Sequence, residues 1–573
     1  MPFRILIAAL LLLVATVTSP GQEREYYFRF VVRPPQAVDI VTRQVSIASV
    51  RGDTVYAFAN EHEWEAFLKL GYCPELLSAH SGSGEAEMSD RPLWTTDWDV
   101  YPTYAGYVAM MQQYERDYPG LCRLDTIGWS TRGKLLLALK ISDSVDVQED
   151  EPEFLYAAAM HGNETVGYVL MLRLADELLR NYGRDSADGG RLTRLVDSLE
   201  IWIHPLANPD GTYYQTDTSV SSARRGNANG VNLNRDFPDR IDDPVNTPDG
   251  REAETRAMMS FVRHHNFTLS ANFHGGAQVV NYPWDNGAAS GTYAKCPDDA
   301  WFIHLSRVYA TPNPDIMSGG FPNGITNGCA WYVIYGGRQD WIYWWHGGRE
   351  TTIELTNEYV PPGSVLPQKW LNNRESFLAY MEEALKGVRG IVRDASTGKP
   401  LAAEVRVATV PGVPVYSDSV VGDYHRMLLP GAYTLIVSAP GFVSDTLEGV
   451  VVTDGAATRL DVALQPIRDG VARAQDLQPA GLVLDQNFPN PFNPATVIRY
   501  HIPPDAHGDR ARRHTTLEVF DPLGRRVATL VDMQHAPGTY TVTFDGSTLA
   551  SGVYFYRLSS GPTSLTRTMV LLE

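Results

Sequence analysis

The spacing of hydrophobic positions divides the chain into segments of different character. Between Trp94 and about Leu385, short apolar runs alternate with stretches of helical periodicity. The strand-like runs are "LLLALKIS", "EFLYAAAM", "LEIWIHP", "FTLSANFH" and "ETTIEL". This alternation predicts an α/β domain at residues 91–386 with a mixed, mainly parallel sheet.

The segment before this domain, residues 22–90, is short and mixed. "YYFRFVV", "VSIASV" and "DTVYAFA" alternate like strands, and "EHEWEAFLKLG" has a helical pattern. The polar, Gly/Ser-rich "SAHSGSGEAEMSD" is typical of a linker. We therefore expect a small pro-like segment, and the sequence leaves open whether it is removed.

At Gly387 the pattern changes to short alternating strands divided by Gly, Pro and Asp turns. It predicts a compact β-sandwich at residues 387–466. A polar linker at residues 467–481 leads to a second all-β segment at residues 482–573. Several domains are expected, because 573 residues exceed what one hydrophobic core supports.

The first 21 residues fit a secretory signal peptide. Arg4 precedes an apolar stretch from Ile5 to Val17, which is too short to span a bilayer, and small residues follow it. No other apolar run approaches transmembrane length. We expect no transmembrane segment in the mature protein.

Charge and cysteine content narrow the classes of partner. The formal net charge is −19, from 48 basic and 67 acidic side chains, which argues against nucleic acid or an anionic membrane as a general partner. The four cysteines lack CxxC metal spacing and do not make a disulfide scaffold. Cys296 and Cys329 could form a bridge in an oxidising compartment, or all four cysteines could be buried free thiols.

A histidine and a glutamate share one predicted strand-to-helix turn. His161 and Glu164 follow the strand-like "EFLYAAAM", and Glu164 opens a segment of helical periodicity. Such turns lie at the carboxyl edge of an α/β sheet, where ligands collect. The pair could hold a metal, but this spacing also arises by chance, so further ligands are needed.

His274 offers a third ligand at the end of "FTLSANFH". Two glycines follow it and permit close approach of the backbone. Two His and one Glu make an open zinc site with a water in the fourth position. Zinc lowers the pKa of that water and polarises a carbonyl, so a nearby carboxylate must accept the water's proton.

Further charged residues could complete such a site. Glu354 interrupts the buried-looking "TTIEL". Burying a carboxylate there costs free energy unless it has a partner. Glu354 could be a general base, or it could be a structural residue in a salt bridge. Arg225 and Arg235, with Asn234 beside the latter, offer donors suited to a carboxylate or a developing oxyanion. By themselves these arginines could equally lie on solvated loops.

Taken together, these stretches resemble the regulatory N/E subfamily of the zinc metallocarboxypeptidases, from Trp94 to Pro466. The matching stretches are "HGNE", "NPDG", "GVNLNRDFP", "HGGAQVVNYPWDN", "GITNGCAWYVIYGGRQDW" and "TTIEL", several in the family's order and spacing. The resemblance implies a mixed sheet with helices on both faces. It also implies one zinc ion on His161, Glu164 and His274, with Glu354 as general base and then proton donor.

The resemblance also implies residues that bind the substrate. Arg225 matches the family's oxyanion-stabilising arginine. Asn234, Arg235 and Tyr332 match the residues that bind the terminal carboxylate of a peptide. An α-carboxylate is the one feature that distinguishes a chain end from an internal peptide bond, so exopeptidase specificity follows.

A preference for C-terminal Arg or Lys is implied as well. Asp285 lies eleven residues after His274, where N/E carboxypeptidases place the acid of the specificity pocket, and Gln339 matches a polar partner of the substrate side chain. Peptide and protein C-termini are therefore the expected partners. Arg338 stands where the family usually has Met, and a cation turned into the pocket would neutralise Asp285.

Asn232 is a second departure from the family pattern. It stands where the family usually has an aspartate that accepts a hydrogen bond from a zinc-bound histidine. An amide oxygen can still orient the histidine ring but lacks the negative charge of an aspartate. Changes in residues that hydrogen-bond to a metal ligand typically lower metal affinity or activity by about 10–100-fold. We expect activity to be retained.

The two β segments resemble known modules. Residues 387–466 resemble the transthyretin-like domain that follows the catalytic domain in this subfamily, with a structural role. Residues 482–573, with "QNFPNPFNPATVIRYHIP" and the closing "TRTMVLLE", resemble the C-terminal sorting domain of bacterial type IX secretion. Export through the periplasm by the type IX machinery is implied, to a secreted or cell-surface location.

Two other functions remain as alternatives. A catalytically silent zinc-fold binding protein at the cell surface would not need Glu354 together with the carboxylate-binding residues. A related zinc hydrolase could act on cell-wall peptides, although the transthyretin-like domain and "NYPWDN" argue against it. The sequence does not give the physiological substrate or the oligomeric state.

Overall fold

The structure is a computed structural model that describes residues 24–33, 37–78, 86–410, 412–467, 482–488, 490–492, 494–503, 513–547, 549–561 and 563–571. The predicted signal peptide and most of the linker at 467–481 lie outside these residues. No helix in the described ranges is both long and apolar enough to cross a membrane. Residues up to Val437 together with Ser444–Leu464 form one compact unit, and Ser438–Val443 with the residues from Gln465 onward form another.

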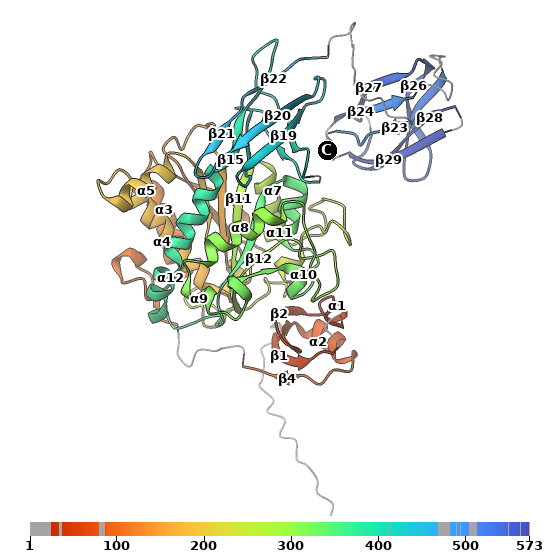
Figure 1. Ribbon diagram of the computed structural model, residues 1–573. Coiled ribbons are helices and arrows are strands. Elements are labelled where there is room, and N and C mark those ends of the chain that lie inside the picture. The colour runs from red at the N-terminus through yellow and green to blue at the C-terminus, as the bar shows by residue number, and fades with distance from the viewer. Residues whose placement is uncertain are drawn as a thin grey trace, which may run out of the picture. The chain divides into compact units, whose positions relative to one another are not determined.

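An eight-stranded sheet forms the centre of the larger unit (Figure 1). In spatial order its strands are β13 (Ile325–Asn327), β12 (Ala277–Tyr282), β14 (Arg349–Thr356), β11 (Phe267–His274), β9 (Glu153–Ala158), β10 (Glu200–His204), β8 (Leu135–Ile141) and β7 (Cys122–Trp129). The pairs β13–β12, β14–β11, β11–β9 and β9–β10 are parallel, and the other pairs are antiparallel. The predicted mixed, mainly parallel sheet is confirmed.

Helices cover both faces of this sheet because its central strands are apolar on both sides. Phe154 and Tyr156 of β9 pack in the larger core, whereas Leu155 belongs to the smaller core on the opposite face. The helices of the larger core are α3 (Tyr104–Asp117), α4 (Thr165–Asn181), α5 (Ala187–Val196), α8 (Asp299–Ala310) and α12 (Leu366–Glu382). Those of the smaller core are α7 (Ala253–Arg263) and α11 (Arg338–Trp341).

Short elements complete this domain. They are α6 (Pro209–Thr212), α9 (Pro314–Met317), α10 (Gly328–Trp331) and the two-stranded pair β5 (Met88–Ser89) and β6 (Tyr101–Pro102). The strands β7, β12 and β13 are absent from the apolar runs that the sequence analysis used. β7 mixes half-buried and exposed residues, and β13 has three residues, so neither carries a continuous apolar signal.

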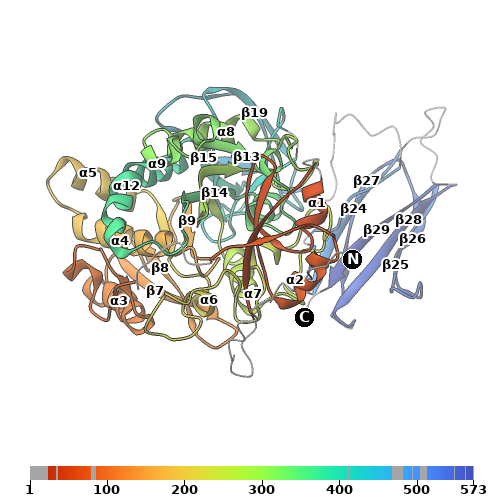
Figure 2. The same cartoon turned by 90° about the horizontal axis from the view of Figure 1, so that it is seen from below.

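The N-terminal domain, residues 24–78, has the predicted three strands and helix. Its elements are β1 (Tyr26–Val31), α1 (Val38–Val41), β2 (Ser46–Arg51), β3 (Thr54–Ala59), α2 (Glu61–Leu68) and β4 (Glu75–Leu76), and its antiparallel sheet has the order β2-β3-β1-β4. Asn60 and Glu63 form a capping box that begins α2. Figure 2 shows α1 and α2 of this domain in red.

A β-sandwich follows α12, as the sequence predicts. One sheet pairs β18 (Asp423–Arg426), β15 (Gly387–Asp394), β21 (Ala457–Arg459) and β22 (Val462–Leu464); the other pairs β17 (Val415–Tyr416), β16 (Glu404–Val407), β19 (Gly431–Ser438) and β20 (Asp445–Val452). The buried Asp298 joins this sandwich to the α/β domain, because its carboxylate accepts hydrogen bonds from Arg426 of β18 and Arg349 of β14.

The C-terminal segment is a second sandwich with its own core around Ile498, Leu517 and Tyr556. One sheet contains β23 (Val483–Leu484), β24 (Ala495–Ile502) and β27 (Gly538–Asp545). The other contains β26 (Arg526–His535), β25 (Arg513–Phe520), β28 (Gly552–Ser560) and β29 (Thr563–Leu571). The prediction of two small all-β domains after the α/β domain is therefore confirmed.

All four cysteines lie in the described part of the chain, and all are free thiols. Cys122, Cys296 and Cys329 are buried, whereas Cys73 is exposed. The possible Cys296–Cys329 bridge is thus not formed, and the expectation of buried thiols is correct for three of the four.

Candidate active site

The turn that carries His161 and Glu164 follows β9 directly. β9 ends at Ala158, and Ala159 takes the left-handed backbone conformation with φ 53° before the chain reaches His161. Glu164 is the N-cap residue of α4. The strand-to-helix turn predicted from the apolar pattern is therefore present.

The "NPDG" stretch supports this turn from behind. The Asn208 amide donates to the Met160 carbonyl at 3.2 Å, and the Thr212 hydroxyl donates to the Gly162 carbonyl at 2.8 Å. A Cβ atom on Gly162 would lie 2.3 Å from the Gly211 backbone, so only glycine fits there. The motif thus positions the metal-ligand turn, a role that sequence analysis had not assigned to it.

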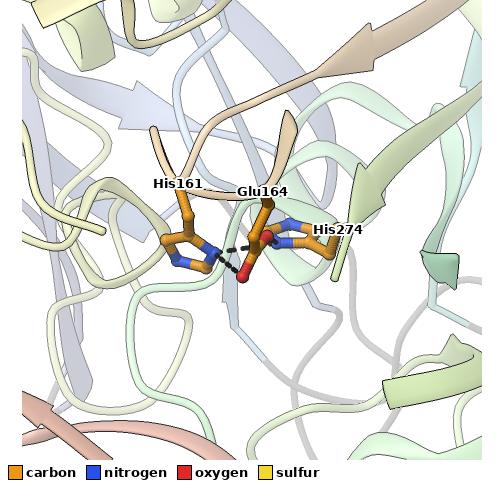
Figure 3. Close-up of side chains that lie close together, drawn as sticks. All are labelled: His161, Glu164 and His274. Carbon is orange, nitrogen blue, oxygen red and sulfur yellow. Dashed lines mark hydrogen bonds and ion pairs between the residues drawn. The ribbon is translucent and has the colours of Figure 1, made fainter. Parts of the chain in front are cut away.

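His161, Glu164 and His274 converge on one point (Figure 3). His274 is the last residue of β11, the strand beside β9. Its Nδ1 lies 2.9 Å from His161 Nδ1 and 2.8 Å from Glu164 Oε2. The other carboxylate oxygen of Glu164 lies 2.9 Å from His161 Nδ1.

Two asparagines orient the histidine rings from outside the cluster. Asn232 Oδ1 lies 2.9 Å from His161 Nε2, and the Asn272 amide lies 2.7 Å from His274 Nε2. Asn272 Oδ1 has no hydrogen-bond partner among the described residues. If the side-chain amide of Asn272 is turned by 180°, this oxygen accepts a hydrogen bond from the Nε2–H of His274. With both Nε2 atoms protonated, each ring presents a lone pair at Nδ1.

The charges of the cluster suit a cation. Burial, with a smaller effect from Arg225, lowers the pKa of His161 to about 3, so this ring is neutral at physiological pH. Burial by itself would raise the pKa of Glu164, but the charges of His161, His274 and Arg225 hold it well below the ordinary value. Two imidazole nitrogens and a carboxylate that face one another fit a zinc ion.

Glu354 lies next to this cluster on β14. In the parallel pairing of β11 and β14 it stands opposite His274. Glu354 Oε2 is buried and has no hydrogen-bond partner in the described ranges. Burial, followed by the charge of Glu164, raises the pKa of Glu354 well above its ordinary value, although Arg225 opposes the shift. The structural alternative, a salt-bridged Glu354, is not what these contacts show.

Arg225 connects the metal cluster to the N-terminal domain. Its Nη1 donates to Glu164 Oε1 at 2.6 Å, and its Nε donates to the Ser46 hydroxyl at 2.7 Å. The side chain is buried, and the charge of Glu164 raises its pKa against the effect of burial. It is therefore a fixed positive charge beside the histidines.

Arg235 and Asn234 belong to a short 3₁₀ turn, Leu233–Arg235, that begins at Asn232. Nη1 of Arg235 donates to the Asn234 carbonyl at 2.7 Å. Its Nε and Nη2 are buried and make no hydrogen bond within the described chain. Burial lowers the pKa of Arg235, although Tyr332 opposes this shift. A buried guanidinium edge without an acceptor favours the binding of an anion.

Asp285 is another buried residue with an atom that lacks a partner among the described residues. Its Oδ1 accepts from the Asn281 amide at 2.9 Å, whereas its Oδ2 is buried without a partner in the part of the chain that is described. Gln339 Nε2 is also buried and unpaired there, while its Oε1 accepts from the Thr352 N–H at 2.8 Å. Burial raises the pKa of Asp285 to about 6.

Asp340 holds the backbone that carries Asp285. It accepts the backbone N–H of Asp285 at 3.0 Å and that of Asn286 at 3.1 Å. Gly328 is required beside this turn, because a Cβ atom there would lie 2.0 Å from Asp285 Oδ1. Asp340 follows Gln339 in the quoted "GGRQDW", so a sequence signal for it existed.

Arg338 turns away from the pocket. Its Nε and Nη2 donate to the two carboxylate oxygens of Glu350, each at 2.9 Å. Glu350 also accepts from the Ser270 hydroxyl at 2.8 Å. The concern that Arg338 would neutralise Asp285 therefore does not apply.

Comparison with known proteins assigns the α/β domain to a family. The zinc carboxypeptidase family matches residues 107–376. Carboxypeptidase M of Mus musculus is 38% identical over 356 residues, which are 60% of this chain and 78% of that protein. This chain belongs to the zinc carboxypeptidase family.

Other relatives of this chain are also carboxypeptidases by name. The carboxypeptidase N catalytic chain of Homo sapiens is 34% identical over 389 residues, covering 62% of this chain and 83% of that protein. Carboxypeptidase D of Rattus norvegicus is 40% identical over 360 residues, covering 60% of this chain. The chain spans only 26% of the length of that carboxypeptidase D.

Both modules after the zinc carboxypeptidase domain also have matching families. A carboxypeptidase regulatory-like domain matches residues 387–465, and a secretion system C-terminal sorting domain matches residues 486–572. The resemblances found in the sequence are confirmed for all three parts.

Proposed function

We propose that this chain is an exported zinc metallocarboxypeptidase that removes C-terminal Arg or Lys from peptides and proteins. The observation that carries the proposal is the buried, unpaired Nε and Nη2 edge of Arg235. Arg338 uses the same edge to bind the carboxylate of Glu350. The edge of Arg235 would bind the α-carboxylate of a peptide in the same bidentate way.

The carboxylate site explains selection of a chain end. An internal peptide bond brings no anion, so it would leave the Arg235 donors buried and unpaired. Asn234 and Tyr332, which lie beside Arg235, would supply further hydrogen bonds to the same carboxylate. Binding energy would therefore be available only to a substrate with a free C-terminus.

His161, Glu164 and His274 would hold one zinc ion, which acts as a Lewis acid and lowers the pKa of a water molecule. Glu354 would take the proton of the attacking water on its unpaired Oε2 and return it to the amine of the departing residue. A raised pKa suits both steps, since the group must accept and then release a proton. Arg225 would stabilise the negative charge that develops on the scissile carbonyl oxygen.

The unpaired oxygen of Asp285 and the unpaired amide of Gln339 would bind the substrate's side chain. A buried carboxylate favours a cation, since pairing relieves the desolvation of both charges. Lys or Arg at the peptide terminus would provide this cation. The sorting domain supports export by the type IX machinery, which would be the protein partner of the C-terminal segment.

The proposal is tested with blocked dipeptides that end in Arg, Lys, Phe or Ala, assayed with and without a chelator. We expect hydrolysis of the Arg and Lys peptides, with chelation abolishing activity and leaving circular dichroism almost unchanged. The core is large enough to fold without a metal. Activity that survives complete removal of zinc would contradict the proposal.

A further inference from the structure

A second group of side chains that can bind a metal lies where the first sandwich meets the α/β domain. Ligand atoms of Asp150, Asp423 and His425 all lie within 4.8 Å of one another. Asp150 belongs to the segment between β8 and β9, whereas Asp423 and His425 are on β18 of the sandwich. The proposed function uses none of these three residues.

Asp423 and His425 form a close pair on one face of β18, since alternate residues of a strand share a face. Both residues are buried, and Asp423 Oδ2 lies 2.8 Å from His425 Nε2. In the candidate zinc cluster of the active site, His161 Nδ1 lies 2.9 Å from Glu164 Oε1. The nitrogen and the oxygen on β18 are therefore spaced like two of the ligand atoms assigned to zinc above.

Asp150 supplies an oxygen atom that has no other partner. Its Oδ1 is buried and makes no hydrogen bond to any described residue, whereas its Oδ2 pairs with Arg459 Nη1. Glu164 in the active site is likewise held by an arginine, Arg225. An arginine that fixes one oxygen of a carboxylate orients the other oxygen for a metal.

The histidine of this group is neutral. His425 lies opposite Arg389 of β15, which in turn lies opposite Arg459 of β21, so the three form a row across neighbouring strands. Burial, followed by the charges of Arg389 and Arg459, lowers the pKa of His425 to about 3, although Asp418 opposes the shift. The imidazole therefore keeps a lone pair for a metal at physiological pH.

The charges around the group favour a divalent cation. Four carboxylates and two guanidinium groups lie against one another here, those of Asp150, Asp418, Asp423, Asp461, Arg389 and Arg459. With a neutral imidazole, these groups leave a formal charge of −2. Burial, followed by the neighbouring Asp418, raises the pKa of Asp423 to about 9, so its negative charge is poorly compensated.

The group lies at the opposite edge of the sheet from the candidate active site. Asp150 precedes the amino end of β9, whereas His161 and Glu164 follow its carboxyl end. The six residues of β9 span about 20 Å. A metal bound here would join two domains and would not contact the peptide bond.

We propose that Asp150, Asp423 and His425 bind a second zinc ion, which links the first sandwich to the α/β domain. An imidazole nitrogen with two carboxylates suits zinc, whereas calcium and magnesium prefer oxygen ligands alone. Because the ligands come from two domains, the ion binds the assembled fold and stabilises it against unfolding.

The test counts zinc on the full chain by equilibrium dialysis and mass spectrometry of the metal. The background variant, His161→Ala with His274→Ala, removes two ligands of the active site, so that any remaining zinc belongs elsewhere. We expect two zinc ions on the wild type and one on the background variant. Adding either His425→Gln or Asp150→Asn to the background should leave none.

The two added substitutions guard against misfolding. Asp150 lies outside the strands and its side chain is 20% exposed, so Asp150→Asn tests the site even where His425→Gln impairs folding. His514→Gln is the matched control, because His514 Nε2 lies 2.8 Å from Asp532 Oδ1 in an exposed pair. In the background chain this control should leave one zinc ion bound.

A stability measurement gives a second readout. In the background variant, zinc at about 100 times its Kd should raise the equilibrium constant for folding by about 100-fold, seen as a higher Tm. His425→Gln should abolish this rise. A background variant that binds no zinc, or a zinc count that both added substitutions leave unchanged, overturns the proposal. Neither readout uses peptide hydrolysis, so failure of the proposed function would leave this test intact.

Discussion

Arg338 and Glu350 hold each other through two hydrogen bonds of 2.9 Å, and neither side chain has exposed surface. Such a buried bidentate pair neutralises both charges within α11 and β14. The cation that replaces a family methionine therefore pairs with Glu350 and not with Asp285, the proposed pocket acid.

The first prediction concerns this acid. Asp285→Asn keeps the size of the side chain and an acceptor for Asn281, but removes the charge. We expect kcat/KM to fall by at least about 100-fold for peptides ending in Arg or Lys, and far less for peptides ending in Ala. Equal losses on all three peptides, or a wild type that prefers Phe, would show that the pocket acid is assigned wrongly.

The selectivity for basic residues should depend on pH. Burial raises the pKa of Asp285 to about 6, so the empty pocket carries a negative charge above that pH and loses it below. The ratio of kcat/KM for Arg-ended to Ala-ended peptides should therefore fall as the pH drops through about 6. It is measured between about pH 5 and about pH 8, where substrate Arg stays protonated. In Asp285→Asn the ratio should be flat; a parallel fall in that variant would assign the effect to another group.

The third prediction tests the ring orientation of His161. Asn232→Ala removes the acceptor that lies 2.9 Å from His161 Nε2. Zinc affinity should fall by about 10–100-fold, whereas Asn232→Asp, which adds charge to the same contact, should raise it. The measurement is zinc competition with a chromophoric chelator. An unchanged affinity in Asn232→Ala would remove Asn232 from the metal site.

A fourth prediction concerns the junction of the catalytic domain and the first sandwich. Asp298→Asn leaves Arg349 and Arg426 buried without their shared carboxylate, so the free energy of unfolding should fall by about 3–5 kcal/mol. Glu404→Gln, which breaks the largely exposed pair with Arg406, is the control and should cost less than about 1 kcal/mol. Urea unfolding followed by tryptophan fluorescence measures both, and similar losses in the two variants would contradict the prediction.

The same carboxylate predicts a dependence of stability on pH. Although burial opposes it, the charges of Arg426 and Arg349 lower the pKa of Asp298 to about 2, below the ordinary value of 3.8. A lowered pKa stabilises the fold above the ordinary value, and this contribution is lost as the pH falls from about 4 toward about 2. Asp298→Asn should lack this part of the acid destabilisation.

The last prediction concerns export. The segment from about Leu482 has its own core, and its family match covers residues 486–572. Truncation near Pro479 should leave the protein in the periplasm with unchanged kcat/KM on small peptides. The candidate zinc ligands and Asp285 lie in the other compact unit. Fractionation of producing cells and peptidase assays measure the two effects. Normal secretion of the truncated chain would refute the sorting role.

The sequence by itself determined the main elements of the α/β domain and the candidate ligand set. Local periodicity predicted β9, β11 and β14. The carboxyl ends of neighbouring parallel strands meet at one edge of a sheet. This arrangement places His161, Glu164 and His274 together. Asn272 could also have been found, because it lies two residues before His274 and alternate residues of a strand share a face.

The tertiary structure decided which partner each buried charge takes. Arg338 could turn toward Asp285 or toward Glu350, and only packing against β14 selects Glu350. The contact of Ser46 with Arg225 joins positions 179 residues apart, between two domains that each fold from their own pattern. Backbone periodicity is a local property of sequence, whereas the direction of a long polar side chain depends on which distant groups its burial leaves within reach.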